Sequence, residues 1–128
     1  MFYLRVLTLL LLMPISLMAS ASQSLSADAL LAQRDDYYVL DVRTPAEYAE
    51  GHVPDAKLLP YDQITADHKL LPDNTETPIV LYCRSGRRAG IAAEALAGLG
   101  YTNLYLLQGS MQGWLEQGLP VEHASTTD

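Results

Sequence analysis

The sequence predicts an α/β fold with a mainly parallel sheet, and two observations lead to that prediction. Residues 37–42 and 79–82 are short apolar runs rich in residues that favour β-structure, which is typical of buried strands. Helical patterns follow these runs, and short strands that alternate with short helices form parallel sheets. Ligands bind such sheets at the carboxyl ends of the strands, so the ends of these runs are where a site is expected.

The elements that precede residues 79–82 have local signals of their own. Ser26 can cap a short helix at residues 26–34. Thr44 as N-cap, with Pro45 at the first helical position, starts a second helix at residues 44–48. The other segments expected here are a turn at 51–56, a short strand at 57–59 ended by Pro60, a short helix at 61–71 and a polar loop at 72–78.

A longer helix is expected after the loop at residues 83–88. Ile91, Ala95 and Leu99 are spaced for one face of it, and Gly100 lies where a C-terminal cap glycine belongs. The remaining segments are a strand at 103–107, a turn at 108–110, a helix at about 111–117 that buries Trp114, and a polar tail after Val121 that we expect to be loose.

The N-terminus has the pattern of a secretory signal peptide at residues 1–21. A positive charge precedes a short apolar stretch, and Ala19-Ser20-Ala21 fits an A-x-A cleavage site. The alternative is a transmembrane anchor, but the stretch is short for a span and Pro14 interrupts it. The mature chain would be one domain, residues 22–128, with its core at about 25–121 and no membrane attachment. In a Gram-negative host it would be periplasmic, and nothing demands more than a monomer.

The charge of the chain is acidic overall and basic in one loop. The sequence has 8 Lys and Arg against 15 Asp and Glu, a formal net charge of −7. That balance argues against binding to nucleic acids and to anionic membrane surfaces. Three of the eight basic residues are nevertheless Arg84, Arg87 and Arg88. Guanidinium groups match two oxygens of an anion at once, so this loop suits a small anionic ligand.

Cys83 is the single cysteine of the chain, and it ends the apolar run at residues 79–82. The loop that follows it leads into a helix, and both helix-start N–H groups and guanidinium charge favour a nucleophilic thiolate. In an oxidising compartment a lone cysteine is an intermolecular bridge, an inert buried thiol or a reactive thiol, and this loop favours the last. No C-x-x-C or Cys/His cluster is present, so we expect no metal site and no cofactor.

Three segments, in chain order, resemble the single-domain rhodaneses, a family of sulfurtransferases. DVRTPAEY at residues 41–48, followed by GHVPDA at 51–56, resembles the N-terminal signature of that family. IVLYCRSGRR at 79–88 resembles its active-site strand and loop, and residues 100–114 resemble its C-terminal strand, turn and helix. The resemblance covers essentially the whole mature chain. Ser110 departs from it, because many members repeat glycine there.

The resemblance implies a five-stranded parallel sheet flanked by helices and a cysteine that carries sulfur. Cys83 would take a sulfane sulfur from a donor such as thiosulfate, release sulfite and become a persulfide. It would then pass the sulfur to a thiophilic acceptor such as cyanide or a thiol, and an ionised thiol needs no general base. The residues that would bind the anionic donor are Arg84, Ser85, Gly86, Arg87 and Arg88.

The individual residues of these segments carry further expectations. One or two of the loop arginines should face the pocket and at least one should face solvent, while Gly86 supplies backbone freedom. Arg43 and Glu47 are expected to pair near a helix start, Asp41 to tie a loop, and His52 to be a turn residue rather than a base.

Other functions remain open at this point. Mercaptopyruvate is an alternative donor, although enzymes that use it tend to have a small neutral residue where this chain has Arg84. A cysteine phosphatase or arsenate reductase has a C-x5-R loop, which is one residue longer than the spacing from Cys83 to Arg88. A non-catalytic module that binds a partner or senses oxidants through an exposed thiol of low pKa is the third possibility.

Overall fold

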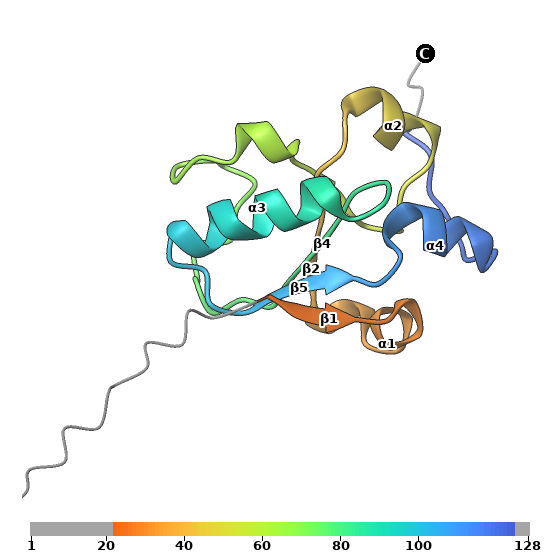
Figure 1. Cartoon of the computed structure of the whole chain (residues 1–128), viewed down its shortest axis with the longest axis horizontal. Helices are drawn as coiled ribbons and strands as arrows, with labels where there is room; N and C mark the ends of the chain where they lie inside the picture. Colours follow the sequence, from red (N-terminus) through yellow and green to blue (C-terminus); the bar gives the residue numbers. More distant parts are fainter. Residues whose placement is uncertain (1–21, 125–128) are drawn as a thin grey trace, which may run out of the picture.

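The structure, a computed structural model, describes residues 22–124 and contains a five-stranded parallel sheet in the order β1-β5-β4-β2-β3 (Figure 1). The expected α/β class and the five-stranded parallel sheet are confirmed. The signal peptide expected at residues 1–21 lies outside the described residues. The strands are β1 Gln23–Leu25, β2 Tyr38–Asp41, β3 Lys57–Leu58, β4 Ile79–Tyr82 and β5 Leu104–Leu107.

Helices lie on both sides of the sheet. Figure 1 shows α3 above the strands and α1 below them, with α4 beyond the end of β5. None of the helices within residues 22–124 is long and apolar enough to cross a membrane. The helices are α1 Ala27–Ala32, α2 Pro45–Glu50, α3 Arg87–Gly98 and α4 Ser110–Glu116, with short 3-10 helices η1 Arg34–Asp36 and η2 Tyr61–Gln63.

Strand β4 lies at the centre of the molecule. It pairs in parallel with β2 on one side and with β5 on the other, and all of its side chains are buried. Because strand side chains alternate between faces, Ile79 and Leu81 pack with α3, whereas Val80 and Tyr82 pack with α1 and α4. A strand buried on both faces needs a continuous apolar sequence, which is the pattern of residues 79–82.

The buried face of α3 is not the one expected. Ile91 is 40 % exposed, so the stripe of Ile91, Ala95 and Leu99 does not form the core face. The buried residues instead follow the i, i+3, i+4, i+7 spacing with small side chains, which lets the helix pack against the sheet. They are Ala89, Ala92, Ala93 and Leu96.

The prediction of a single helix at residues 61–71 is wrong. Only η2 is helical there, and the backbone then follows turns in which the His68 N–H donates to Thr65 O and the Leu71 N–H to His68 O. Ile64 and Leu71 still pack against the core, so a helical spacing marked buried residues without specifying a helix.

Both ends of the described chain differ from expectation as well. The residue pattern did not predict β1, because only Leu25 of its three residues is buried. This strand joins the sheet by pairing with β5.

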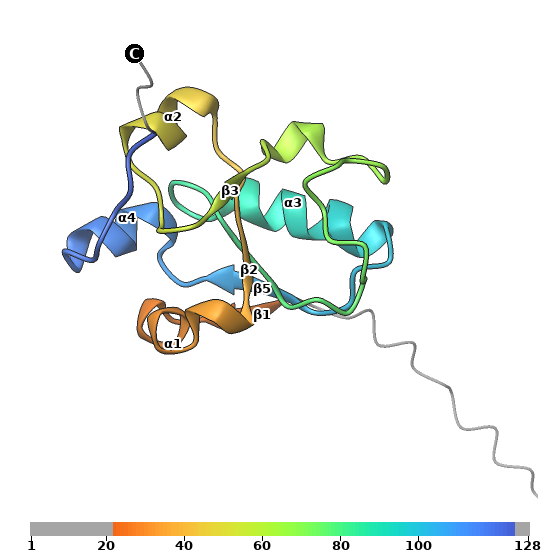
Figure 2. The same ribbon diagram turned by 180° about the vertical axis from the view of Figure 1, so that it is seen from behind.

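The tail after Val121 is not loose at its start. His52 and Glu122 exchange two backbone hydrogen bonds of 2.8 and 2.9 Å. Figure 2 shows this segment running from α4 up to α2.

A buried ion pair at the end of β2 joins the two central strands. Asp41 is fully buried and accepts hydrogen bonds from Arg43 Nη2 over 2.6 Å and from the Tyr82 hydroxyl over 2.6 Å. The pairing expected between Arg43 and Glu47 is therefore wrong, because Asp41 is closer in the fold. Burial, with the neighbouring Asp41 carboxylate, raises the pKa of Tyr82, so its hydroxyl remains a donor. That hydroxyl also accepts the Val53 N–H over 3.1 Å.

Replacing Tyr82 with Phe should therefore destabilise the protein by about 1–3 kcal/mol, because the buried Asp41 oxygen and Val53 N–H each lose a partner. Urea denaturation followed by circular dichroism measures the change. Tyr105→Phe is the matched control, since Tyr105 is half-buried and its hydroxyl forms no hydrogen bond within residues 22–124. Equal stability losses in the two variants would contradict the role given to the Tyr82 hydroxyl.

Candidate active site

Cys83 is the first residue after β4, at the carboxyl end of the central strand. Its side chain is buried, with 1 % of its surface exposed. The chain has only Arg84, Ser85 and Gly86 in which to turn from the strand into α3. Gly86 has φ +117°, a left-handed conformation that strains any residue with a side chain, so glycine allows a turn this short.

This turn directs backbone N–H groups at the Cys83 sulfur. The Gly86 N–H donates to Sγ over 2.9 Å. Burial by itself raises the pKa of the thiol, but the backbone N–H groups of Ala89, Gly86, Ser85 and Arg88 outweigh it, so the pKa lies below its ordinary value. The geometry therefore favours a thiolate without a neighbouring side-chain base.

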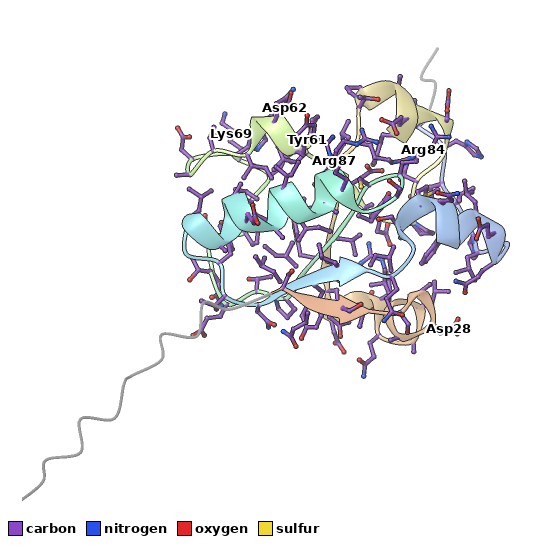
Figure 3. All side chains as sticks on the ribbon, viewed as in Figure 1. Asp28, Tyr61, Asp62, Lys69, Arg84 and Arg87 are labelled. Atoms are coloured by element: carbon purple, nitrogen blue, oxygen red, sulfur yellow. The ribbon has the colours of Figure 1, made fainter. Side chains whose placement is uncertain are left out.

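The three arginines of the loop have different surroundings. Arg84 and Arg87 are exposed, and neither side chain forms a hydrogen bond or an ion pair with the rest of residues 22–124. Figure 3 places Arg87 on the side of Tyr61 and Arg84 toward α4, so the two flank the loop. Arg88 differs from both, because it donates to the two carboxylate oxygens of Glu47 over 2.8 and 3.0 Å. Both Nη groups of the Arg88 guanidinium are hydrogen-bonded to Glu47. Arg84 and Arg87 are therefore the loop arginines that are free to bind an anion.

Glu47 connects α2 to the start of α3. It forms a capping box with Thr44, whose hydroxyl accepts the Glu47 N–H over 3.2 Å. The Arg88 guanidinium is the main cause that lowers the pKa of Glu47 to about 2. Arg88 is thereby fixed beside the N-terminus of α3, where its charge interacts with Cys83.

The start of α4 holds the backbone of the loop from the other side. The Met111 N–H donates to Cys83 O over 2.9 Å, and the Gln112 N–H donates to Arg84 O over 3.0 Å. The Cys83 N–H in turn donates to Ser110 Oγ over 3.3 Å. The sequence pattern did not reveal Glu47 or Ser110 as parts of this site. The one signal was the serine at a position where the family pattern has glycine.

These features define the chemistry that is available. A buried sulfur anion at a strand end, with fixed N–H donors around it and two exposed guanidinium groups nearby, can attack a small anionic substrate and hold the charge that results. Within the part of the chain that the structure describes, no group of three or more His, Cys, Asp or Glu is placed to hold a metal ion.

Comparison with known proteins gives the family. Residues 26–117 match the family model of the rhodanese-like domain, so the chain belongs to the rhodanese-like sulfurtransferase family and the resemblance is confirmed. A sulfurtransferase of Allochromatium vinosum is 36 % identical over 104 residues, which cover 81 % of this chain and 95 % of that protein. Thiosulfate sulfurtransferase GlpE of Pseudoalteromonas translucida is 27 % identical over 97 residues, covering 76 % and 90 %.

Solved structures agree with the family. The rhodanese-related protein from Thermoplasma volcanium superposes with a TM-score of 0.69 at 30 % identity, over 78 % of this chain and 97 % of that one.

The Glu47–Arg88 pair should contribute to stability only above acidic pH. Because the pKa of Glu47 in the folded protein is lowered from 4.5 to about 2, its contribution is complete above about pH 5 and is lost as pH falls toward 2. Glu47→Gln should therefore cost about 1 kcal/mol at pH 7, a value limited by partial exposure, and much less at pH 3. Urea denaturation at several pH values measures this. Glu50→Gln, an exposed acid in the same helix, should show no such trend, and a pH-independent loss in Glu47→Gln would refute the pairing.

Proposed function

We propose that this protein is a thiosulfate sulfurtransferase that carries sulfur as a persulfide on Cys83. The observation that carries the proposal is the buried Cys83 sulfur with loop N–H groups that favour its anionic form. The thiolate attacks the outer sulfur of thiosulfate, so a bond forms between Sγ and that sulfur while the S–S bond of thiosulfate breaks. The bonding electron pair leaves with sulfite.

The second half of the cycle restores the enzyme without a cofactor. A thiophilic acceptor such as cyanide or a thiolate attacks the outer sulfur of the persulfide, and the electron pair of that S–S bond returns to Cys83 Sγ. Negative charge is present on sulfur at every stage. The backbone N–H groups around Cys83 are already oriented toward the sulfur, so they stabilise this charge without reorganisation.

Arg84 and Arg87 would bind the donor, because they are exposed beside the loop and lack partners among residues 22–124. A guanidinium group can meet two oxygens of thiosulfate and of the departing sulfite. Arg88 would act differently, as a fixed positive charge beside the sulfur rather than as a ligand of the substrate.

The names of the relatives support thiosulfate as the donor. Besides the thiosulfate sulfurtransferase above, a thiosulfate:glutathione sulfurtransferase of Saccharomyces cerevisiae is 31 % identical over 102 residues, covering 70 % of this chain and 73 % of that protein. That name also favours a small thiol as acceptor. Mercaptopyruvate is the second candidate donor, and Arg84 directly after Cys83 weighs against it. A thiol that serves only as an oxidant sensor would form sulfenic acid with peroxide but no stable persulfide with thiosulfate.

Thiosulfate should add the mass of one sulfur atom to the protein, and cyanide should remove it again with release of thiocyanate. Intact-mass spectrometry before and after each reagent measures both steps. Cys83→Ser should fold normally, gain no sulfur and show no turnover, because the hydroxyl cannot replace the thiolate. Turnover in that variant would refute the mechanism. Failure of the wild-type protein to gain sulfur from thiosulfate, with a gain from mercaptopyruvate, would assign the other donor.

Arg84→Ala and Arg87→Ala should each raise the KM for thiosulfate by up to about tenfold, the effect of losing one charge-assisted hydrogen bond. Steady-state kinetics at constant ionic strength measure this. Lys69→Ala removes the same charge from the segment between η2 and β4, which Figure 3 shows away from the loop that follows Cys83, and should leave the KM unchanged. Unchanged KM values in both arginine variants would show that backbone N–H groups alone hold the anion.

A further inference from the structure

Ser110 combines a strained backbone with a buried polar side chain. Its φ is +51°, in the left-handed region that residues with side chains rarely adopt, and it follows Gly109, whose φ is +74°. Only 1 % of its surface is exposed. Glycine would take this backbone conformation without strain, so the serine costs strain here, and its hydroxyl is the group that a glycine would lack.

The hydroxyl of Ser110 contacts the nucleophilic residue itself. Its Oγ accepts the buried Cys83 N–H over 3.3 Å, while the Cys83 carbonyl accepts the Met111 N–H over 2.9 Å. Strand β5 pairs with β4 only as far as Leu81 and Leu106. Beyond that point β4 has no strand partner on the β5 side, and the start of α4 provides the hydrogen-bond partners for both backbone groups of Cys83.

We propose that Ser110 is a positioning residue for sulfur transfer, whose hydroxyl fixes the backbone of Cys83 so that Sγ stays within reach of the loop N–H groups. The contact between Gly86 N and Sγ is 2.9 Å long, and hydrogen bonds weaken as they lengthen and bend. Without the hydroxyl, the Cys83 N–H is buried without a partner and the end of the strand can shift to find one. The consequence for catalysis rests on the proposed function, whereas the consequence for the thiolate does not.

Two substitutions separate positioning from a purely structural role. Ser110→Ala removes the hydroxyl and keeps the backbone strain, whereas Ser110→Gly removes the hydroxyl and relieves the strain. If Ser110 served only to form the turn, the glycine variant would be as stable and as reactive as the wild type. If Ser110 positions Cys83, both variants lose reactivity of the thiol, whatever happens to their stability.

The test is the rate of Cys83 alkylation by iodoacetamide as a function of pH. We expect the apparent pKa of the thiol to rise by roughly half to one unit in both variants, which lowers the alkylation rate below that pKa by about three- to tenfold. The kcat for thiosulfate should fall by a similar factor with little change in KM. Ala95→Gly, a destabilising change on the exposed side of α3, is the control and should leave the alkylation profile unchanged.

A wild-type alkylation profile in Ser110→Gly would overturn the proposal, and this variant keeps the test valid even if Ser110→Ala does not fold. The two proposals also fail in different ways. If the wild-type protein transfers no sulfur, the proposed function fails, while a raised thiol pKa in the Ser110 variants still supports the positioning of Cys83.

Discussion

The chemistry of the site depends on the backbone N–H groups that face the Cys83 sulfur. A buried anion is unfavourable unless donors are already in place around it. Backbone donors can occupy those places only if β4 ends at Tyr82, Gly86 reverses the chain and α3 begins at Arg87. The central strand and the longest helix are therefore placed so that the turn between them and the first turn of α3 direct N–H groups at one sulfur atom.

Two ion pairs hold this arrangement from the side of β2, and they act in different ways. Asp41 is fully buried and bonded to Arg43 and Tyr82, so loss of one partner would leave a buried polar group unsatisfied. Glu47 and Arg88 are partly exposed, and their pair contributes less to stability. Its importance is geometric, because it fixes the first turn of α3 against α2, and N–H groups of that turn bind the sulfur.

The fold class and the position of the nucleophile could be predicted from the sequence because both depend on contiguous segments. The apolar run that ends at Cys83 specifies a strand and the loop after it specifies a turn into a helix. The pairing of Glu47 with Arg88 could not be predicted, because the residues are 41 positions apart and meet only when α2 and α3 are placed. Spacing along the chain suggested Arg43 instead. Ser110 was missed for the same reason, since its contact with Cys83 exists only in the folded sheet.

The distribution of charge favours a small anion over a large one. The chain carries a net charge of −7, so an anion is repelled by the protein as a whole. Glu47 offsets Arg88, which leaves Arg84 and Arg87 as the exposed positive charges of the loop. At physiological ionic strength their attraction extends about 8 Å. A molecule the size of thiosulfate would remain within that range, whereas a nucleic acid would extend over acidic surface. The same charge pattern therefore disfavours a large polyanion and suits a small anion such as the donor that we propose.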